Sequence, residues 1–158
     1  MKSDAIFSKD RAYRYVLTRI WSKKSEEYAN MIAFIGLNPS KANENENDRT
    51  ITKCINFAKS WGYDGIYMLN LFAYVSTSPD NLYNDSIDPI GNENDKFILE
   101  YSKKADKVVC VWGNCGSFKN RSKDVLAKLD KKYCLKINKS NEPSHPLYLA
   151  ADTKLIEF

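Results

Sequence analysis

Short apolar runs alternate with amphipathic segments along the chain. Residues 13–21 are rich in β-branched and aromatic side chains, and this composition predicts a strand. Continuous apolar runs, which are typical of strands covered on both faces, predict four more strands. These runs span residues 31–36, 65–75, 107–112 and 133–137.

Three helices are predicted between the strands. The clearest spans residues 49–61, because its apolar residues follow the i, i+3, i+4, i+7 spacing of one helix face. Asp48 is its expected N-cap, and Gly62 suits its C-terminal cap. The other two helices are predicted at about 94–104 and about 119–130.

The resulting order, β-β-α-β-α-β-α-β, defines the expected fold class. Strands that alternate with helices imply right-handed crossovers and a mostly parallel sheet. We therefore expect an α/β three-layer sandwich, with helices on both faces of a mostly parallel central sheet and an extra antiparallel strand at the N-terminus. Neither an internal repeat nor a linker is visible, so residues 1–158 are expected to form a single domain.

Composition narrows the class of protein. The 158 residues are 43% hydrophobic and 13% aromatic, which excludes a disordered or low-complexity chain. The net charge of +4 permits a phosphate-bearing ligand without requiring one, and a clamp for duplex DNA is usually more basic. The chain has neither an apolar stretch of membrane-spanning length nor a signal peptide, so we expect a cytoplasmic protein with no membrane partner. The four cysteines include no CxxC pair, which predicts free, buried thiols and no zinc site.

Polar or glycine-bearing segments follow the apolar strands. They are GLNPS at 36–40, LNLF at 69–72, WGNCG at 112–116 and SHPLY at 144–148. In open α/β sheets, ligands bind outside the carboxyl ends of the strands. We therefore expect one crevice to collect the polar members of these segments, which are Asn38, Asn70, residues 112–114 and His145.

A resemblance rests on four motifs, GLNPS, YMLNLF, VVCVWGNCGSFKNR and SHPLYL. Together they resemble an uncharacterised family of bacterial and phage domains of unknown function, over nearly the whole chain. More distantly, their order resembles that of the uracil-DNA glycosylase superfamily. That superfamily has a water-positioning motif after its first strand, an asparagine after the second and a histidine motif after the last.

The glycosylase resemblance implies a role for each matching residue. Asn38 matches the position that orients the attacking water, and Asn70 matches the asparagine that reads the pyrimidine edge. His145 matches the histidine that hydrogen-bonds the base carbonyl. Gly36 and Pro39 match residues that shape the first loop. Further candidates for contacts to the base or nucleotide are Ser40, Asp48, Arg49, Trp112, Gly113 and Lys119.

The implied chemistry is hydrolysis of an N-glycosidic bond, without a metal or a cofactor. Bond cleavage builds negative charge on the base, and a preorganised donor aimed at that charge contributes about 2.7–4 kcal/mol. An asparagine amide offers a donor and an acceptor to a pyrimidine edge, but it cannot take a proton from water. We therefore expect slow chemistry unless a carboxylate such as Asp48 lies close.

Departures from the glycosylase pattern bear on the substrate. The first motif lacks the aromatic residue that stacks on a flipped base, and the fourth reads HPLY in place of HPS. After His145, only Leu147, Tyr148 and Leu149 are apolar candidates for a wedge that fills a duplex. Because extracting a base from a duplex costs a few kcal/mol, single strands or free nucleotides are favoured over duplex DNA.

Structural interpretations of the same residues stay open. Asn38 could instead form a turn, and Asn70 could cap a strand end. His145 could be a surface residue, and Trp112 could belong to the core. The basic residues after the third motif form either a solvated face or a phosphate seat, and they are Lys119, Arg121 and Lys123. Two function classes therefore remain. One is a glycosylase-like hydrolase, and the other is a module that binds a nucleotide or nucleic acid in the same crevice without turnover.

Overall fold

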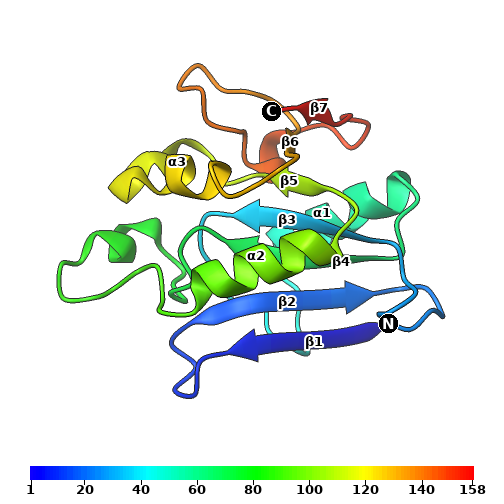
Figure 1. Cartoon of the computed structure of the whole chain (residues 1–158), viewed down its shortest axis with the longest axis horizontal. Helices are drawn as coiled ribbons and strands as arrows, with labels where there is room; N and C mark the ends of the chain where they lie inside the picture. Colours follow the sequence, from blue (N-terminus) through cyan, green and yellow to red (C-terminus); the bar gives the residue numbers. More distant parts are fainter.

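The computed structural model describes residues 1–158 as an α/β protein built on one seven-stranded mixed sheet (Figure 1). The strands are β1 (Lys2–Phe7), β2 (Arg14–Ile20), β3 (Met31–Gly36), β4 (Gly65–Asn70), β5 (Val108–Cys110), β6 (Tyr133–Cys134) and β7 (Ile156–Glu157). Their order across the sheet is β1-β2-β4-β3-β5-β6-β7. The four central strands, β3 to β6, run parallel, whereas β1, β2 and β7 pair antiparallel with their neighbours. The α/β class is therefore confirmed, with antiparallel pairing at both edges.

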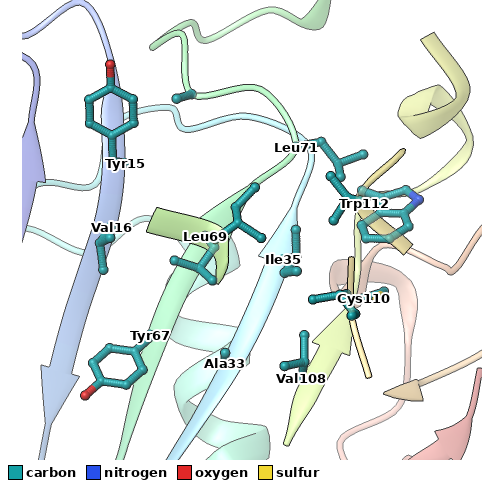
Figure 2. Packing of buried hydrophobic residues seen from close by; sticks show 14 of the residues in the cluster. Tyr15, Val16, Ala33, Ile35, Tyr67, Leu69, Leu71, Val108, Cys110 and Trp112 are labelled. Carbon is teal, nitrogen blue, oxygen red and sulfur yellow. The ribbon is translucent and has the colours of Figure 1, made fainter. Parts of the chain in front are cut away.

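Helices lie on both faces of the sheet. On one face, α1 (Arg49–Ser60) packs against a hydrophobic cluster that includes Phe34 of β3. On the other face, α2 (Asn94–Lys104) and α3 (Arg121–Leu126) cover a second cluster that includes Ile35. Figure 2 shows this second cluster, and Figure 1 shows α2 in front of the sheet. Neighbouring residues of β3 thus point to opposite faces, which explains why the whole run is apolar.

Three short 3₁₀ helices lie in the connections, namely η1 (Pro79–Tyr83), η2 (Asn114–Asn120) and η3 (Pro146–Tyr148). Asp48 caps α1 as predicted, since its Oδ1 accepts the N–H of Ile51 at 2.9 Å. Gly62 follows the helix with a φ of +84°, a conformation that favours glycine. No helix combines the length and the apolar character needed to cross a membrane.

Several predicted elements differ from the observed ones. The strands predicted over 107–112 and 133–137 are shorter, as β5 and β6. The strand predicted over 65–75 ends at Asn70, because the buried apolar residues that follow are bonded to loops. The helix predicted over 119–130 is wrong in its first turn, where η2 precedes the shorter α3. Lys119 and Asn120 adopt φ values of 54° and 57° there, which no α-helix contains. The edge strands β1 and β7 escaped prediction, because one is half polar and the other has two residues.

A β-bulge near the start of β2 turns one side chain to the other face of the sheet. Adjacent residues of β1 lie opposite Val16 and Arg14, so Tyr15 has no partner of its own. Tyr15 and Val16 consequently both belong to the cluster beneath α2 (Figure 2). Arg14 turns instead to the α1 side, where its Nη1 donates to the carbonyl of Ala42 at 3.0 Å. Bulges commonly re-aim a side chain in this way.

Candidate functional site

A cavity of about 160 Å³ lies at the carboxyl ends of β3 and β4, beside the start of β2. Asn38, Asn70 and His145 line it together, although they are far apart in the sequence. A protein cavity of about 150 Å³ holds one benzene ring, so this cavity has the size of a single six-membered ring. Other predicted residues in its wall are Gly36, Pro39, Ser40, Asp48 and Trp112.

The amide of Asn38 is held in one orientation by two backbone carbonyls. Its Nδ2 donates to the carbonyl of Pro39 at 3.1 Å and to that of Ser76 at 3.0 Å. Both amide hydrogens are therefore used within the protein. The Oδ1 atom makes no hydrogen bond in the structure and is the free acceptor that Asn38 offers to a ligand or a water.

Asn70 contributes an unsatisfied donor. It ends β4 and is only 1% exposed, and its Nδ2 is buried without a hydrogen-bond partner. On the other side of the amide, Oδ1 lies close to the backbone of Gly36. A buried donor left without a partner costs about 1–3 kcal/mol, which a ligand oxygen placed against Nδ2 would recover.

Two buried side chains fix the strand end that carries Asn70. Asn94 donates from Nδ2 to the carbonyls of Asn70 and Leu71, at 3.0 and 3.1 Å. Arg121 donates from Nε to the carbonyl of Leu71 at 2.7 Å and pairs with Asp95 at 2.5 Å. Arg121 is 2% exposed, so the solvated-face interpretation was wrong for this residue. Sequence analysis missed both anchors, because nothing local distinguishes an inward-facing helix start from an exposed one.

One ring nitrogen of His145 is free of protein partners. Its Nδ1 accepts the N–H of Leu147 at 3.3 Å at the start of η3, so the neutral ring carries its hydrogen on Nε2. No protein group bonds to Nε2. Burial lowers the pKa of His145 below its usual 6.5, against an opposing effect of the Asp48 charge. The imidazole is therefore a neutral donor at pH 7.

Asp48 brings a carboxylate to the same cavity. One of its oxygens caps α1, while the other accepts no hydrogen bond from the protein. The first turn of α1, including Thr50, also lines the cavity. The N–H of Thr50 has no acceptor within the protein. From the sequence, slow hydrolysis was expected unless a carboxylate such as Asp48 lay close, and Asp48 and Asn38 line the same cavity.

Arg14 lines the cavity and was not predicted from the sequence. Its side chain is 2% exposed, and Nε is buried without a hydrogen-bond partner. Burial lowers its pKa to about 10, so the guanidinium stays charged at neutral pH. This position could not be predicted from the sequence. Regular alternation from Leu17, which faces α1, would place Arg14 on the opposite face of the sheet, but the bulge at Tyr15 reverses the alternation.

Three predicted residues lie outside the cavity wall. Arg49 is exposed and lines a separate open groove along α1, and Gly113 lies beside His145 with a φ of +77°. Lys119 is exposed, with its ammonium 5.4 Å from the ring centre of Phe118. Trp112 lies in the wall but is 1% exposed and belongs to the core cluster, which favours the core interpretation (Figure 2).

The cysteines and other metal-binding side chains form no centre. All four cysteines are free, and no group of three His, Cys, Asp or Glu side chains is placed to hold a metal ion. Three of the thiols are buried as predicted. The prediction was wrong for Cys115, which is exposed because it lies in η2 rather than on a strand or a packed helix.

Comparison with known protein families assigns the chain to one family. The family described as "Protein of unknown function (DUF1643)" matches residues 14–147, and the protein belongs to that family. The matched region begins at Arg14 and ends at Leu147, so it includes every strand end that contributes to the cavity. Among curated proteins and among solved structures, none matches the chain.

Proposed function

We propose that the cavity binds a pyrimidine base and that the protein hydrolyses the N-glycosidic bond of that base. The substrate is a nucleotide or a single-stranded nucleic acid. One observation carries the proposal. Asn38 Oδ1, Asn70 Nδ2 and His145 Nε2 have no protein partners, and their residues line one cavity the size of a ring.

The free groups are complementary to a uracil-like ring. Such a ring has two carbonyl oxygens that accept hydrogen bonds and a ring N–H that donates one. Asn70 Nδ2 and His145 Nε2–H are the donors for the oxygens, and Asn70 Oδ1 is an acceptor for the N–H. Small ligands are commonly oriented in this way, by a few polar groups in a largely preformed pocket.

The proposed reaction uses Asn38, Asp48 and His145. The C1′–N bond breaks and its electron pair stays on the base, where His145 donates to the oxygen that gains charge. Asn38 Oδ1 holds the water whose oxygen forms the new C1′–O bond. The free oxygen of Asp48 takes the proton of that water, and the proton passes to the departing base.

An exposed aromatic residue supports a single-stranded substrate. Tyr148 is 89% exposed, and its ring centre lies 6.1 Å from that of His145. Aromatic side chains beside a groove stack on successive bases of single strands with little sequence preference. A neighbouring base of the same strand would stack on Tyr148 while the reacting base occupies the cavity.

The glycosylase resemblance gives further support at the level of architecture. In the proposed correspondence, the sheet with helices on both faces is the glycosylase arrangement, and the motifs at the ends of β3 and β4 and before η3 supply its three polar positions. Fold kinship alone does not determine activity, so the free groups of the cavity carry more weight.

A binding module is the second candidate function. It is favoured by one observation, that Asp48 is the only carboxylate in the cavity wall and already uses one oxygen to cap α1. A site with weak proton acceptors binds a base without turning it over. The same contacts to Asn70 and His145 would then serve recognition.

The two functions are separated by a base-release assay. The protein is incubated with uracil-containing single-stranded and duplex oligonucleotides of one sequence and with free deoxyuridine monophosphate, and released uracil is measured by chromatography. Hydrolysis predicts release that is fastest from single strands and that falls at least about 100-fold in Asn38→Ala and His145→Ala. The control Asn92→Ala, at an exposed asparagine outside the cavity, keeps full release. Thermal stabilisation by these compounds without release supports the binding module instead.

A further inference from the structure

Arg14 is a buried cation that makes no ion pair, although the charge of Asp48 in the same cavity wall acts on it. Its side chain is 2% exposed, and none of the ion pairs in the structure includes it. Its one hydrogen bond runs from Nη1 to the carbonyl of Ala42, at 3.0 Å. Nε is buried without an acceptor, and Nη2 donates to no protein group. An unpaired ion in a protein interior is strongly unfavourable.

The other two buried arginines differ from Arg14 in this respect. Arg19 donates to five oxygen atoms, four of them backbone carbonyls. Arg121 donates to the carbonyl of Leu71 and to the carboxylate of Asp95. Arg19 therefore donates from all three of its guanidinium nitrogens, and Arg121 donates from two, one of them to a carboxylate. In contrast, Arg14 has donors without an acceptor, and it is the buried arginine that lines the cavity.

The cavity wall indicates which kind of anion Arg14 accepts. Besides His145 Nε2–H, the donors in the wall are Arg14, Asn70 Nδ2 and the free N–H of Thr50. The free acceptors are Asn38 Oδ1 and one oxygen of Asp48. A phosphate has oxygens that accept and would also face the Asp48 carboxylate. A ring anion has a single charge spread over its oxygens and keeps an N–H for an acceptor. The ring anion therefore matches both the donors and the acceptors of the wall, and it fits the cavity volume of about 160 Å³.

We propose that Arg14 is a further substrate-binding residue, which donates to the ring oxygen that carries the negative charge of a pyrimidine anion. This inference rests on the proposed function, since that anion is the base as it leaves the sugar. When the C1′–N bond breaks, the electron pair enters the ring and its charge reaches the oxygens. Arg14 remains protonated throughout and gives up no proton.

The test compares a charged ring with a neutral one. Barbiturate is a pyrimidine trione that is an anion at neutral pH, and uracil is a neutral ring of similar size. Titration calorimetry should show barbiturate binding at least about tenfold more tightly than uracil to the wild-type protein, because hydrogen bonds to charged groups are the stronger kind. Arg14→Gln should reduce the ratio of the two affinities to about one. Arg11→Gln, at an exposed arginine paired with Glu44, should leave it unchanged.

Three results would overturn the proposal. They are equal affinity for the two rings in the wild-type protein, a preference that survives in Arg14→Gln, and inorganic phosphate that displaces barbiturate at lower concentration than uracil does. If Arg14→Gln does not fold, Arg14→Lys keeps the charge and should keep most of the preference. The affinities are measured without turnover. Absence of base release would therefore count against hydrolysis alone. Base release by the wild-type protein, together with an Arg14→Gln variant that keeps the preference for barbiturate, would count against this proposal alone.

Discussion

Gly36 and Asn70 lie opposite each other on β3 and β4, and a Cβ atom at Gly36 would lie 3.0 Å from Asn70 Oδ1. The same Cβ would lie 2.8 Å from Cε of Met68, a flexible side-chain end that can move. The amide of Asn70 therefore occupies space that only glycine leaves open. This close approach limits the positions that the Asn70 amide can take in the cavity wall.

Gly36→Ala is expected to displace the Asn70 amide and weaken the binding of free uracil about tenfold, the equivalent of one hydrogen bond. Calorimetry on wild type, the two single variants and the double variant measures the coupling. In Asn70→Ala the added methyl group has no amide to displace, so Gly36→Ala should cost little there. Equal losses in both backgrounds would mean that the methyl group acts elsewhere.

Asp48 has two roles that substitutions can separate. Asp48→Asn keeps a capping oxygen for Ile51 and removes the charge, so stability should change little while base release falls. Asp48→Ala also removes the cap and should lower the free energy of unfolding by about 1 kcal/mol. Thermal denaturation and the release assay on both variants make the comparison. Full release in Asp48→Asn would exclude the carboxylate from the chemistry.

Arg19 holds the loop that leads to Asp48 and α1. Its guanidinium donates to the backbone carbonyls of Asn43 and Glu46 and to the side chain of Asn47. Arg19→Gln leaves most of these oxygens without a donor and should destabilise the protein by about 3 kcal/mol, measured by urea denaturation. Arg11→Gln removes an exposed ion pair and should cost less than about 1 kcal/mol. Similar losses in the two variants would contradict the anchoring role of Arg19.

The depressed pKa of His145 predicts how stability depends on pH. The folded state favours the neutral ring, so its contribution to stability is complete above pH 6.5 and is lost as the pH falls through the lower folded pKa. Over that window the free energy of unfolding should fall more steeply in wild type than in His145→Gln, by at most about 1.4 kcal/mol per pH unit. Parallel curves from urea denaturation at pH 5 to 8 would show that the ring is not held neutral.

Local patterns were sufficient for the central elements of the fold. β3 is a continuous apolar run, and α1 has a regular apolar face between a capping aspartate and a glycine. The strand-end positions of Asn38 and Asn70 followed from the same pattern, because parallel strands bring their carboxyl ends to one edge. His145 was also expected at a strand end, but β6 ends at Cys134 and His145 instead precedes η3. These features depend only on neighbours in the sequence.

Features that depend on distant contacts were missed. Arg14 reaches the cavity because a bulge against β1 shifts the register, and β1 itself is too polar to predict. Arg121 looked like part of a basic surface, but it is buried because the carbonyl of Leu71 and Asp95 accept its donors. The φ values of Lys119 and Asn120 likewise interrupt a segment whose composition suits a helix. Register shifts and buried polar partners are set by tertiary packing, which alternation does not encode.

The most direct test of the account is a titration of the ¹⁵N-labelled protein with free uracil, followed by nuclear magnetic resonance. Asn70 Nδ2 is a buried donor without a partner, so its amide signals should shift on ligand binding, together with the His145 ring signals. The exposed amide of Asn92 should not shift. Binding that moves other signals and leaves Asn70 and His145 unchanged, or no binding at all by the folded protein, would contradict a base-binding cavity at this edge of the sheet.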